Sequence, residues 1–178
     1  MSLSIGDPIP LFALPDTSDH MHRVDGGAHG KAASVVVFTC NHCPYALAWH
    51  DRLLAVAGDY KPREVRFYAI CSNDGDRYPR DSFAAMKQRV QADGGWPMPY
   101  LRDEDQDVAR AFGAKTTPDV FVFDADDRLV YRGAPDASSD DSSQNAQWLR
   151  DALDDLLAGG PVARPETQPV GCSIKWKV

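Results

Sequence analysis

One segment of this chain constrains its fold more than any other, because it joins a buried strand to a helix through two cysteines. Ser34–Thr39 is an unbroken, valine-rich run, which is typical of a strand covered on both faces. The motif Cys-Asn-His-Cys follows at residues 40–43, and Pro44 then opens a segment with the apolar spacing of a helix. The run Val65–Cys71 predicts the next strand. We therefore predict a strand–helix–strand unit with a right-handed crossover.

The remaining segments extend this unit into an α/β domain. We expect a hairpin at residues 9–14 and 21–24, helices at 82–92 and 105–112, a second hairpin at 120–123 and 129–131, and a last helix that is capped within 140–143 and ends at 159–160. The polar stretch 135–143 is expected to be a solvated loop. We find no internal repeat and no linker, so we predict one domain at residues 1–158 and a C-terminal tail at 159–178 packed on it through Ile174 and Trp176.

Composition excludes several classes of function. The 178 residues carry 19 Lys and Arg against 26 Asp and Glu, a net charge of −7 that disfavours nucleic acid as a partner. The first residues lack the pattern of a signal peptide, and the longest apolar run, 32–40, is about half the length of a membrane span. We expect a cytoplasmic protein with no membrane association. Four cysteines are too few for a disulfide scaffold, so their chemistry matters more than cross-linking.

The spacing of Cys40 and Cys43 indicates redox chemistry. Two cysteines three residues apart at the start of a helix lie within disulfide range. The helix N-terminus is expected to lower the pKa of Cys40, and His42 between the cysteines is expected to stabilise its thiolate further. Cys40 is then the nucleophile and Cys43 the less exposed resolving thiol. The sequence does not fix whether the pair oxidises or reduces its partner.

Other interpretations of the motif stay open. The cysteines could form a static disulfide, although a reducing compartment disfavours one. They could also bind a metal together with His42 or His50, although the paired ligand clusters of a structural zinc site are missing from the sequence. His42 could also be an exposed residue without a redox role.

A second element lies downstream. Thr117-Pro118 precedes the strand predicted at 120–123, a position where proline is tolerated because it cannot donate to a strand ladder. From the local sequence alone, an ordinary turn proline is the simplest interpretation.

Together, a strand–CxxC–helix junction, a later Thr-Pro and a final hairpin and helix resemble the thioredoxin superfamily. The N-terminal hairpin and the extra segment 73–113 resemble its redoxin branch, which includes alkyl hydroperoxide reductase-like, thiol-specific antioxidant-like and TlpA-like proteins. The resemblance covers residues 3–158. It implies a thioredoxin-like fold, with a central mixed β-sheet flanked by helices. It also implies that Pro118 is cis and packs against the disulfide, and that Thr117, Pro118 and Asn41 contact the partner.

The resemblance implies a thiol-disulfide oxidoreductase in cell redox homeostasis. It needs no cofactor, and its expected partners are protein disulfides or dithiols, low-molecular-weight thiols and a thioredoxin-type reductase system. One alternative is an antioxidant thiol peroxidase resembling peroxiredoxins. Val37 and Cys40, three residues before Cys40 and Cys43, stand where the peroxiredoxin motif has threonine, which argues against efficient peroxide reduction. Another alternative is a metal-binding module of thioredoxin fold.

Two cysteines lie outside the motif. Cys71 ends an apolar strand and is expected to pack as a small hydrophobic residue. Cys172 lies in the apolar tail Gly-Cys-Ser-Ile-Lys-Trp. Its interpretation stays open between packing of the tail and a third redox thiol.

Overall fold

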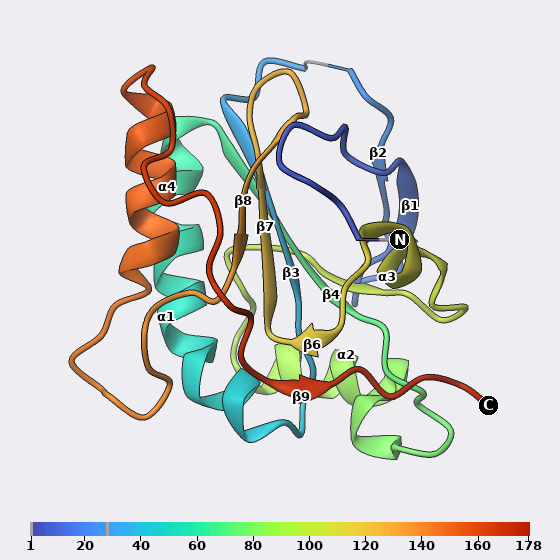
Figure 1. The fold of residues 1–178 in the computed structure, drawn as a ribbon. Coiled ribbons are helices and arrows are strands. Elements are labelled where there is room, and N and C mark those ends of the chain that lie inside the picture. Colours follow the sequence, from blue (N-terminus) through green and yellow to red (C-terminus); the bar gives the residue numbers. More distant parts are fainter. Residues whose placement is uncertain (1, 28) are drawn as a thin grey trace.

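A computed structural model describes residues 2–27 and 29–178 (Figure 1). In chain order the elements are β1 (Phe12–Pro15), β2 (Met21–Val24), β3 (Ala33–Phe38), α1 (Pro44–Tyr60), η1 (Lys61–Arg63), β4 (Val65–Cys71), η2 (Pro79–Asp81), α2 (Phe83–Ala92), β5 (Tyr100–Arg102), α3 (Asp107–Phe112), β6 (Thr116–Thr117), β7 (Asp119–Phe123), β8 (Leu129–Gly133), α4 (Gln147–Leu157) and β9 (Cys172–Ser173).

The central sheet has five strands in the order β5-β4-β3-β7-β8. Strands β3, β4 and β5 are parallel, whereas β7 runs antiparallel to β3 and β8 antiparallel to β7. The end of β3 therefore meets the beginning of β7, and Phe38 lies opposite Ile70 on one side and Asp119 on the other. The mixed sheet with flanking helices confirms the predicted thioredoxin-like fold class, and the parallel pair β3 and β4 confirms the predicted crossover unit.

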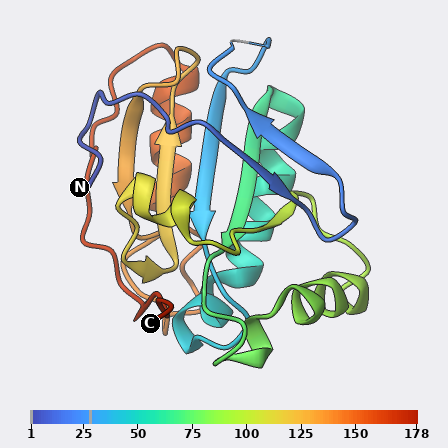
Figure 2. The same cartoon turned by 90° about the vertical axis from the view of Figure 1, so that its right-hand side faces the viewer.

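Helices and the N-terminal hairpin cover the two faces of the sheet. Helices α1 and α4 lie on one face, and α3 lies on the other with the N-terminal segment (Figures 1 and 2). All six residues of β3 are buried, as a valine-rich strand between two apolar layers requires. None of the helices in residues 2–27 and 29–178 combines the length and the apolar character that crossing a membrane requires.

Helix α1 begins where the sequence predicts and positions the cysteine motif. Pro44 is its first residue, where the missing N–H costs nothing, and Cys43 is the N-cap. The helix buries Trp49, Leu53 and Val56 against the sheet at intervals of one helical turn. This packing fixes the start of α1 at the carboxyl end of β3.

The structure differs from the sequence prediction at the start of the last helix. Residues 140–143 do not cap it, because the Asp141 carboxylate accepts the N–H of Ser143 in a separate turn. Helix α4 begins at Gln147, after Ala146 adopts a left-handed conformation with φ of 61°. The short edge strand β5 was also missed, since three residues after a proline-rich loop carry no periodic signal.

The loop at 135–143 is less solvated than its composition predicts. Asp136 is buried, and its carboxylate accepts hydrogen bonds from the Trp49 indole at 2.8 Å, the backbone N–H of Ala146 at 2.9 Å and the guanidinium of Arg52. Arg52 also donates to the carbonyls of Ser138 and other loop residues. One carboxylate thus attaches the loop to α1.

Replacing Asp136 with Ala is expected to destabilise the protein by about 3 kcal/mol, because it removes the acceptor of two buried donors, the Trp49 indole and the Ala146 N–H, and the ion-pair partner of the partly buried Arg52. Urea denaturation of the two proteins measures the difference. Asp140→Ala, at an exposed position of the same loop, is the matched control and should change the free energy of unfolding by less than about 0.5 kcal/mol. Equal effects of the two substitutions would contradict this assignment.

Candidate active site

The two cysteines of the motif lie at the junction between β3 and α1, one on the loop and one at the N-cap. Both Cys40 and Cys43 are 0% exposed. The backbone N–H of Cys43 points at the Cys40 sulfur, with a nitrogen–sulfur distance of 3.3 Å. The expectation that Cys40 is the more exposed of the pair is wrong in this state of the protein, because the surrounding segments cover both sulfurs.

The Thr117-Pro118 loop packs directly against the cysteines. The peptide bond between Thr117 and Pro118 is cis, as the resemblance implies. The Thr117 hydroxyl lies 3.3 Å from the Cys40 sulfur, and the Cys43 thiol donates to the Thr117 carbonyl at 3.2 Å. Because β7 is antiparallel to β3, the residues before β7 necessarily arrive beside the residues after β3. The sheet therefore brings together segments that are 77 residues apart.

The surroundings shift the pKa values of the two thiols in opposite directions. Hydrogen bonding to Cys43, then burial and the charge of Asp81, raise the pKa of Cys40 well above its ordinary value. The pKa of Cys43 is lowered, chiefly because the Cys40 side chain hydrogen-bonds to it, with the Cys172 side chain and the backbone of Ala46 acting in the same sense. Because each thiol hydrogen-bonds to the other, the two pKa values belong to the pair, and the Cys40 thiolate stays a prediction.

Asp81 is the central polar residue that sequence reasoning missed. It ends η2 and is 0% exposed. Its carboxylate accepts the backbone N–H of Asn41 at 2.7 Å and the side-chain amide of Asn73 at 2.9 Å, and it also pairs with Nδ1 of His42. Asp81 therefore holds the middle of the cysteine motif from a segment 40 residues away. The one hint in the sequence is that Asp81 lies in the segment that follows the parallel strand β4. Segments that follow parallel strands meet at the carboxyl edge of the sheet.

The Asn41 side chain is occupied by contacts within the chain. Its amide N–H donates to the carbonyl of Arg80 at 2.8 Å. Its oxygen accepts from the Arg89 guanidinium and from the Tyr100 hydroxyl, both at 2.8 Å. These bonds make Asn41 a positioning residue of the loop in this state, in addition to the partner contact that the sequence predicts.

His42 lies between Asp81 and solvent. Its ring stacks on Tyr78, with ring centroids 5.6 Å apart and an angle of 4° between the planes. One ligand atom from each of Cys40, His42 and Asp81 lies within 4.8 Å of the others, so these three residues could hold a metal ion. His50, the other histidine considered for a metal site, packs on Trp96 instead.

The C-terminal tail reaches the same site, a position that the sequence left open for Cys172. Strand β9 pairs antiparallel with β6, and Cys172 lies opposite Thr117 (Figure 1). Gly171 approaches so closely that a Cβ there would lie 2.2 Å from the Thr117 carbonyl oxygen. Further along, Ile174 is buried and Arg110 lies over the Trp176 ring. The tail thus passes over the loop that contacts both cysteines.

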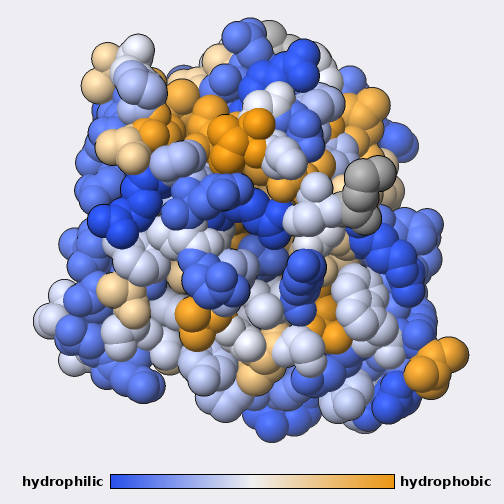
Figure 3. Space-filling model, in the orientation of Figure 1, coloured by the Kyte–Doolittle hydropathy of each residue, from blue (hydrophilic) through white to orange (hydrophobic). Residues whose placement is uncertain are grey.

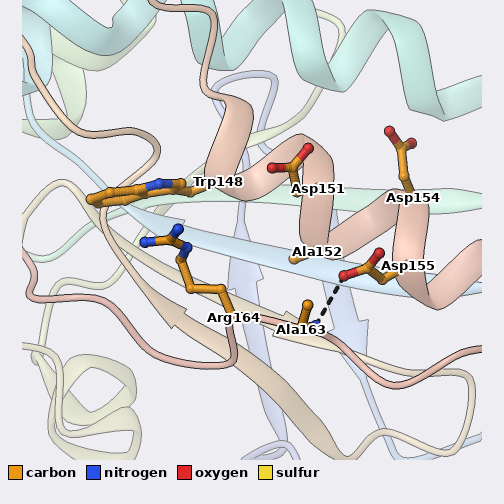
Figure 4. Close-up of a pocket in the computed structure, with 7 residues that line it drawn as sticks. All are labelled: Trp148, Asp151, Ala152, Asp154, Asp155, Ala163 and Arg164. Carbon is orange, nitrogen blue, oxygen red and sulfur yellow. Dashed lines mark hydrogen bonds between the residues drawn. The ribbon is translucent and has the colours of Figure 1, made fainter.

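Other surface features lie apart from the sulfurs. On the face in Figure 3, the larger hydrophobic areas are in the upper half, away from the region where Figure 1 shows β6 and β9. A hollow of about 400 Å³ lies between α4 and the tail (Figure 4). It is lined by Trp148, Arg164 and several aspartates, and includes none of the residues of the cysteine site. Its chemistry is therefore independent of the cysteine pair.

Comparisons with known proteins show which family this chain matches and which solved structures it resembles. The redoxin family model matches residues 4–148. A crystal structure of an uncharacterized conserved protein from Geobacillus kaustophilus is 41% identical with a TM-score of 0.91, covering 98% of this chain and 93% of that one. A hypothetical protein, SMc02350, from Sinorhizobium meliloti 1021 is 33% identical with a TM-score of 0.92, covering 100% and 97%. No curated protein matches the chain.

More distant structures share the fold. One is a putative thiol:disulfide interchange protein DsbE from Chlorobium tepidum, 18% identical with a TM-score of 0.67, covering 88% of this chain and 99% of that one. Another is the peroxidoxin BcpB from Mycobacterium tuberculosis, 19% identical with a TM-score of 0.61, covering 88% and 95%. At these identities the likeness concerns the fold alone.

The charge of Asp81 is expected to control the acidity of Cys40. In a Cys43→Ser background, which removes the coupling between the thiols, Asp81→Asn should lower the Cys40 pKa because a neighbouring negative charge disappears. The midpoint of Cys40 alkylation against pH, followed by mass spectrometry, should move down by about 1 pH unit. Asp76→Asn, at an exposed position of the same loop, should leave the midpoint unchanged. An upward shift with Asp81→Asn would refute this role.

Proposed function

Since this chain belongs to the redoxin family, we propose that it is a thiol-disulfide oxidoreductase that cycles a disulfide between Cys40 and Cys43. The observation that carries the proposal is the contact of both sulfurs with Thr117, at 3.3 Å and 3.2 Å, beside the cis peptide bond. The two cysteines need only form a bond within one turn of chain, so the cycle requires no large rearrangement of α1.

In the oxidising direction a partner thiolate attacks the Cys40 sulfur of the disulfide. A bond forms between the partner sulfur and Cys40, the Cys40–Cys43 bond breaks, and Cys43 leaves as a thiolate. The Cys172 side chain and the backbone of Ala46 favour the Cys43 thiolate as it leaves. A second partner thiolate then attacks the partner sulfur of the mixed disulfide, which releases the oxidised partner and leaves Cys40 reduced.

The reducing direction runs through the same steps backwards. Cys40 attacks a partner disulfide, and the Cys43 thiolate resolves the mixed disulfide by attacking Cys40. Hydrogen bonds from the Thr117 hydroxyl and the Cys43 N–H stabilise the Cys40 thiolate when it forms. Suitable partners are protein disulfides and dithiols, low-molecular-weight thiols and a thioredoxin-type reductase system.

Thiol trapping across a glutathione redox series tests the proposal. Wild type should form a reversible Cys40–Cys43 disulfide, located by mass spectrometry. Cys40→Ser should lower the rate of disulfide reduction on a model substrate by about 100-fold or more, and Cys43→Ser should accumulate the mixed disulfide. Cys71→Ala, which alters a buried cysteine outside the pair, is the control and should retain activity.

Two results would contradict the oxidoreductase. One is a pair that stays reduced across the whole series. The other is rapid consumption of hydrogen peroxide that Cys40→Ser abolishes, since this would make the thiol peroxidase alternative correct.

The metal-binding alternative is favoured by the proximity of Cys40, His42 and Asp81. The Asp81 carboxylate already accepts two hydrogen bonds besides its pairing with His42, so an ion must compete with those donors. On this alternative, reduced protein should take up equimolar zinc, and His42→Ala should weaken binding by about 10-fold or more. Isothermal titration calorimetry measures the zinc affinity of each protein, with His50→Ala as the control. Zinc-free reduced protein that takes up no added zinc would eliminate this alternative.

A further inference from the structure

Strand β9 of the C-terminal tail pairs with β6 beside the two cysteines of the motif. Two interactions of Thr117 bear on the tail: its carbonyl accepts the Cys43 thiol, and its strand position pairs with Cys172. Cys172 is therefore held beside the redox pair, where it packs against the core cluster that contains Cys43, and each of the two side chains shifts the pKa of the other. It is only partly buried, whereas Cys71, the other cysteine outside the motif, is fully buried.

The chain on both sides of Cys172 fixes it there. On one side, Gly171 lies against the Thr117–Pro118 peptide, at a distance that no side chain permits. On the other side, the N–H of Ile174 donates to the carbonyl of Lys115 at 3.0 Å, and the N–H of Lys175 donates to the Asn73 side chain at 2.8 Å. These contacts before and after Cys172 hold its thiol beside Cys43.

We propose that Cys172 is a third exchanging thiol, which attacks Cys43 in the Cys40–Cys43 disulfide and yields a Cys43–Cys172 disulfide with Cys40 free. The proposal rests on the redox cycle of the pair. The Cys172 thiolate forms a bond to the Cys43 sulfur, the Cys40–Cys43 bond breaks, and Cys40 leaves as a thiolate. One disulfide is exchanged for another, so the step consumes no oxidant or reductant. The proton released by Cys172 goes to solvent.

Oxidation of the pair prepares this step. In the reduced protein, burial and the neighbouring Cys43 raise the pKa of Cys172 to about 11. Once Cys43 is in a disulfide it carries no charge, so its contribution disappears while Lys175 still favours the Cys172 thiolate. The departing Cys40 sulfur is received by the Thr117 hydroxyl and the Cys43 N–H.

The exchange changes whether β9 can move away from the cysteine site when a partner binds. A Cys43–Cys172 disulfide ties β9 covalently over the site, so a partner cannot displace the tail. When Cys40–Cys43 is the oxidised pair, the tail is held by noncovalent contacts, among them the pairing of β6 with β9 and the burial of Ile174. The third thiol therefore determines whether the tail can leave the partner site.

Peptide mapping separates the two disulfides. Trypsin releases Cys40 and Cys43 together in peptide 32–52, and releases Cys172 in peptide 151–175 because Arg164 is followed by Pro165. A Cys40–Cys43 disulfide is internal to the first peptide, whereas a bond to Cys172 links the two. After equilibration in oxidised glutathione and acid trapping, wild type should contain both forms, with Cys40 alkylated in the linked one. Cys40→Ser should contain mostly the linked form.

A matched control moves the thiol by one residue. In Cys172→Ser/Ser173→Cys the tail keeps one cysteine, but neighbouring side chains of a strand point to opposite sides, and Ser173 is exposed. This variant should lose the linked peptide and keep the Cys40–Cys43 disulfide. Gly171→Ala should also lower the linked fraction, because its Cβ pushes β9 away from Thr117.

The outcomes distinguish this inference from the proposed function. If Cys40–Cys43 cycles reversibly while neither wild type nor Cys40→Ser links the peptides, the third thiol is refuted and the oxidoreductase stands. Linkage that is as frequent in the Ser173 control as in wild type would also refute it, since an unplaced tail thiol would then suffice. If no disulfide forms within peptide 32–52 in Cys172→Ser, where the exchange is impossible, the proposed function fails first.

Discussion

Thr117 is the contact on which the arrangement of this site depends. Its hydroxyl meets the Cys40 sulfur, its carbonyl accepts the Cys43 thiol, and its strand position pairs with Cys172. The contacts with Cys40 and Cys43 follow from the antiparallel pairing of β7 with β3, which brings the residues before one strand to the end of the other. The contact with Cys172 needs in addition the pairing of β9 with β6. A single loop thereby gathers three of the four cysteines in the protein.

A second layer of polar contacts fixes the cysteine motif from the other side. Asp81 receives the Asn41 N–H and pairs with His42, and Arg89 and Tyr100 hold the Asn41 side chain. A buried carboxylate with its donors satisfied constrains the loop without adding a partner contact of its own. The same charge raises the pKa of Cys40, so the residue that orders the loop also tunes the thiol.

Much of the fold follows from local patterns. The valine-rich run predicts β3, and the motif with Pro44 predicts the start of α1, because strand and helix periodicities are local properties of the chain. The prediction failed where contacts between distant parts of the chain determine the local structure. The start of α4 and the buried state of Asp136 depend on Arg52 and Trp49, about 85 residues earlier in the chain, and no local pattern encodes that pairing.

Some features of the site can likewise be predicted from the sequence, whereas others depend on the tertiary structure. By itself the sequence determined the fold class, the pair Cys40 and Cys43 and their place at a strand–helix junction, because two cysteines three residues apart carry their geometry with them. Only the tertiary structure decided that Asp81 lies beneath the motif, that both sulfurs are covered, and that Cys172 reaches Cys43. These relations join segments 40 to 129 residues apart, and only the closing of the sheet and the docking of the tail bring them into contact.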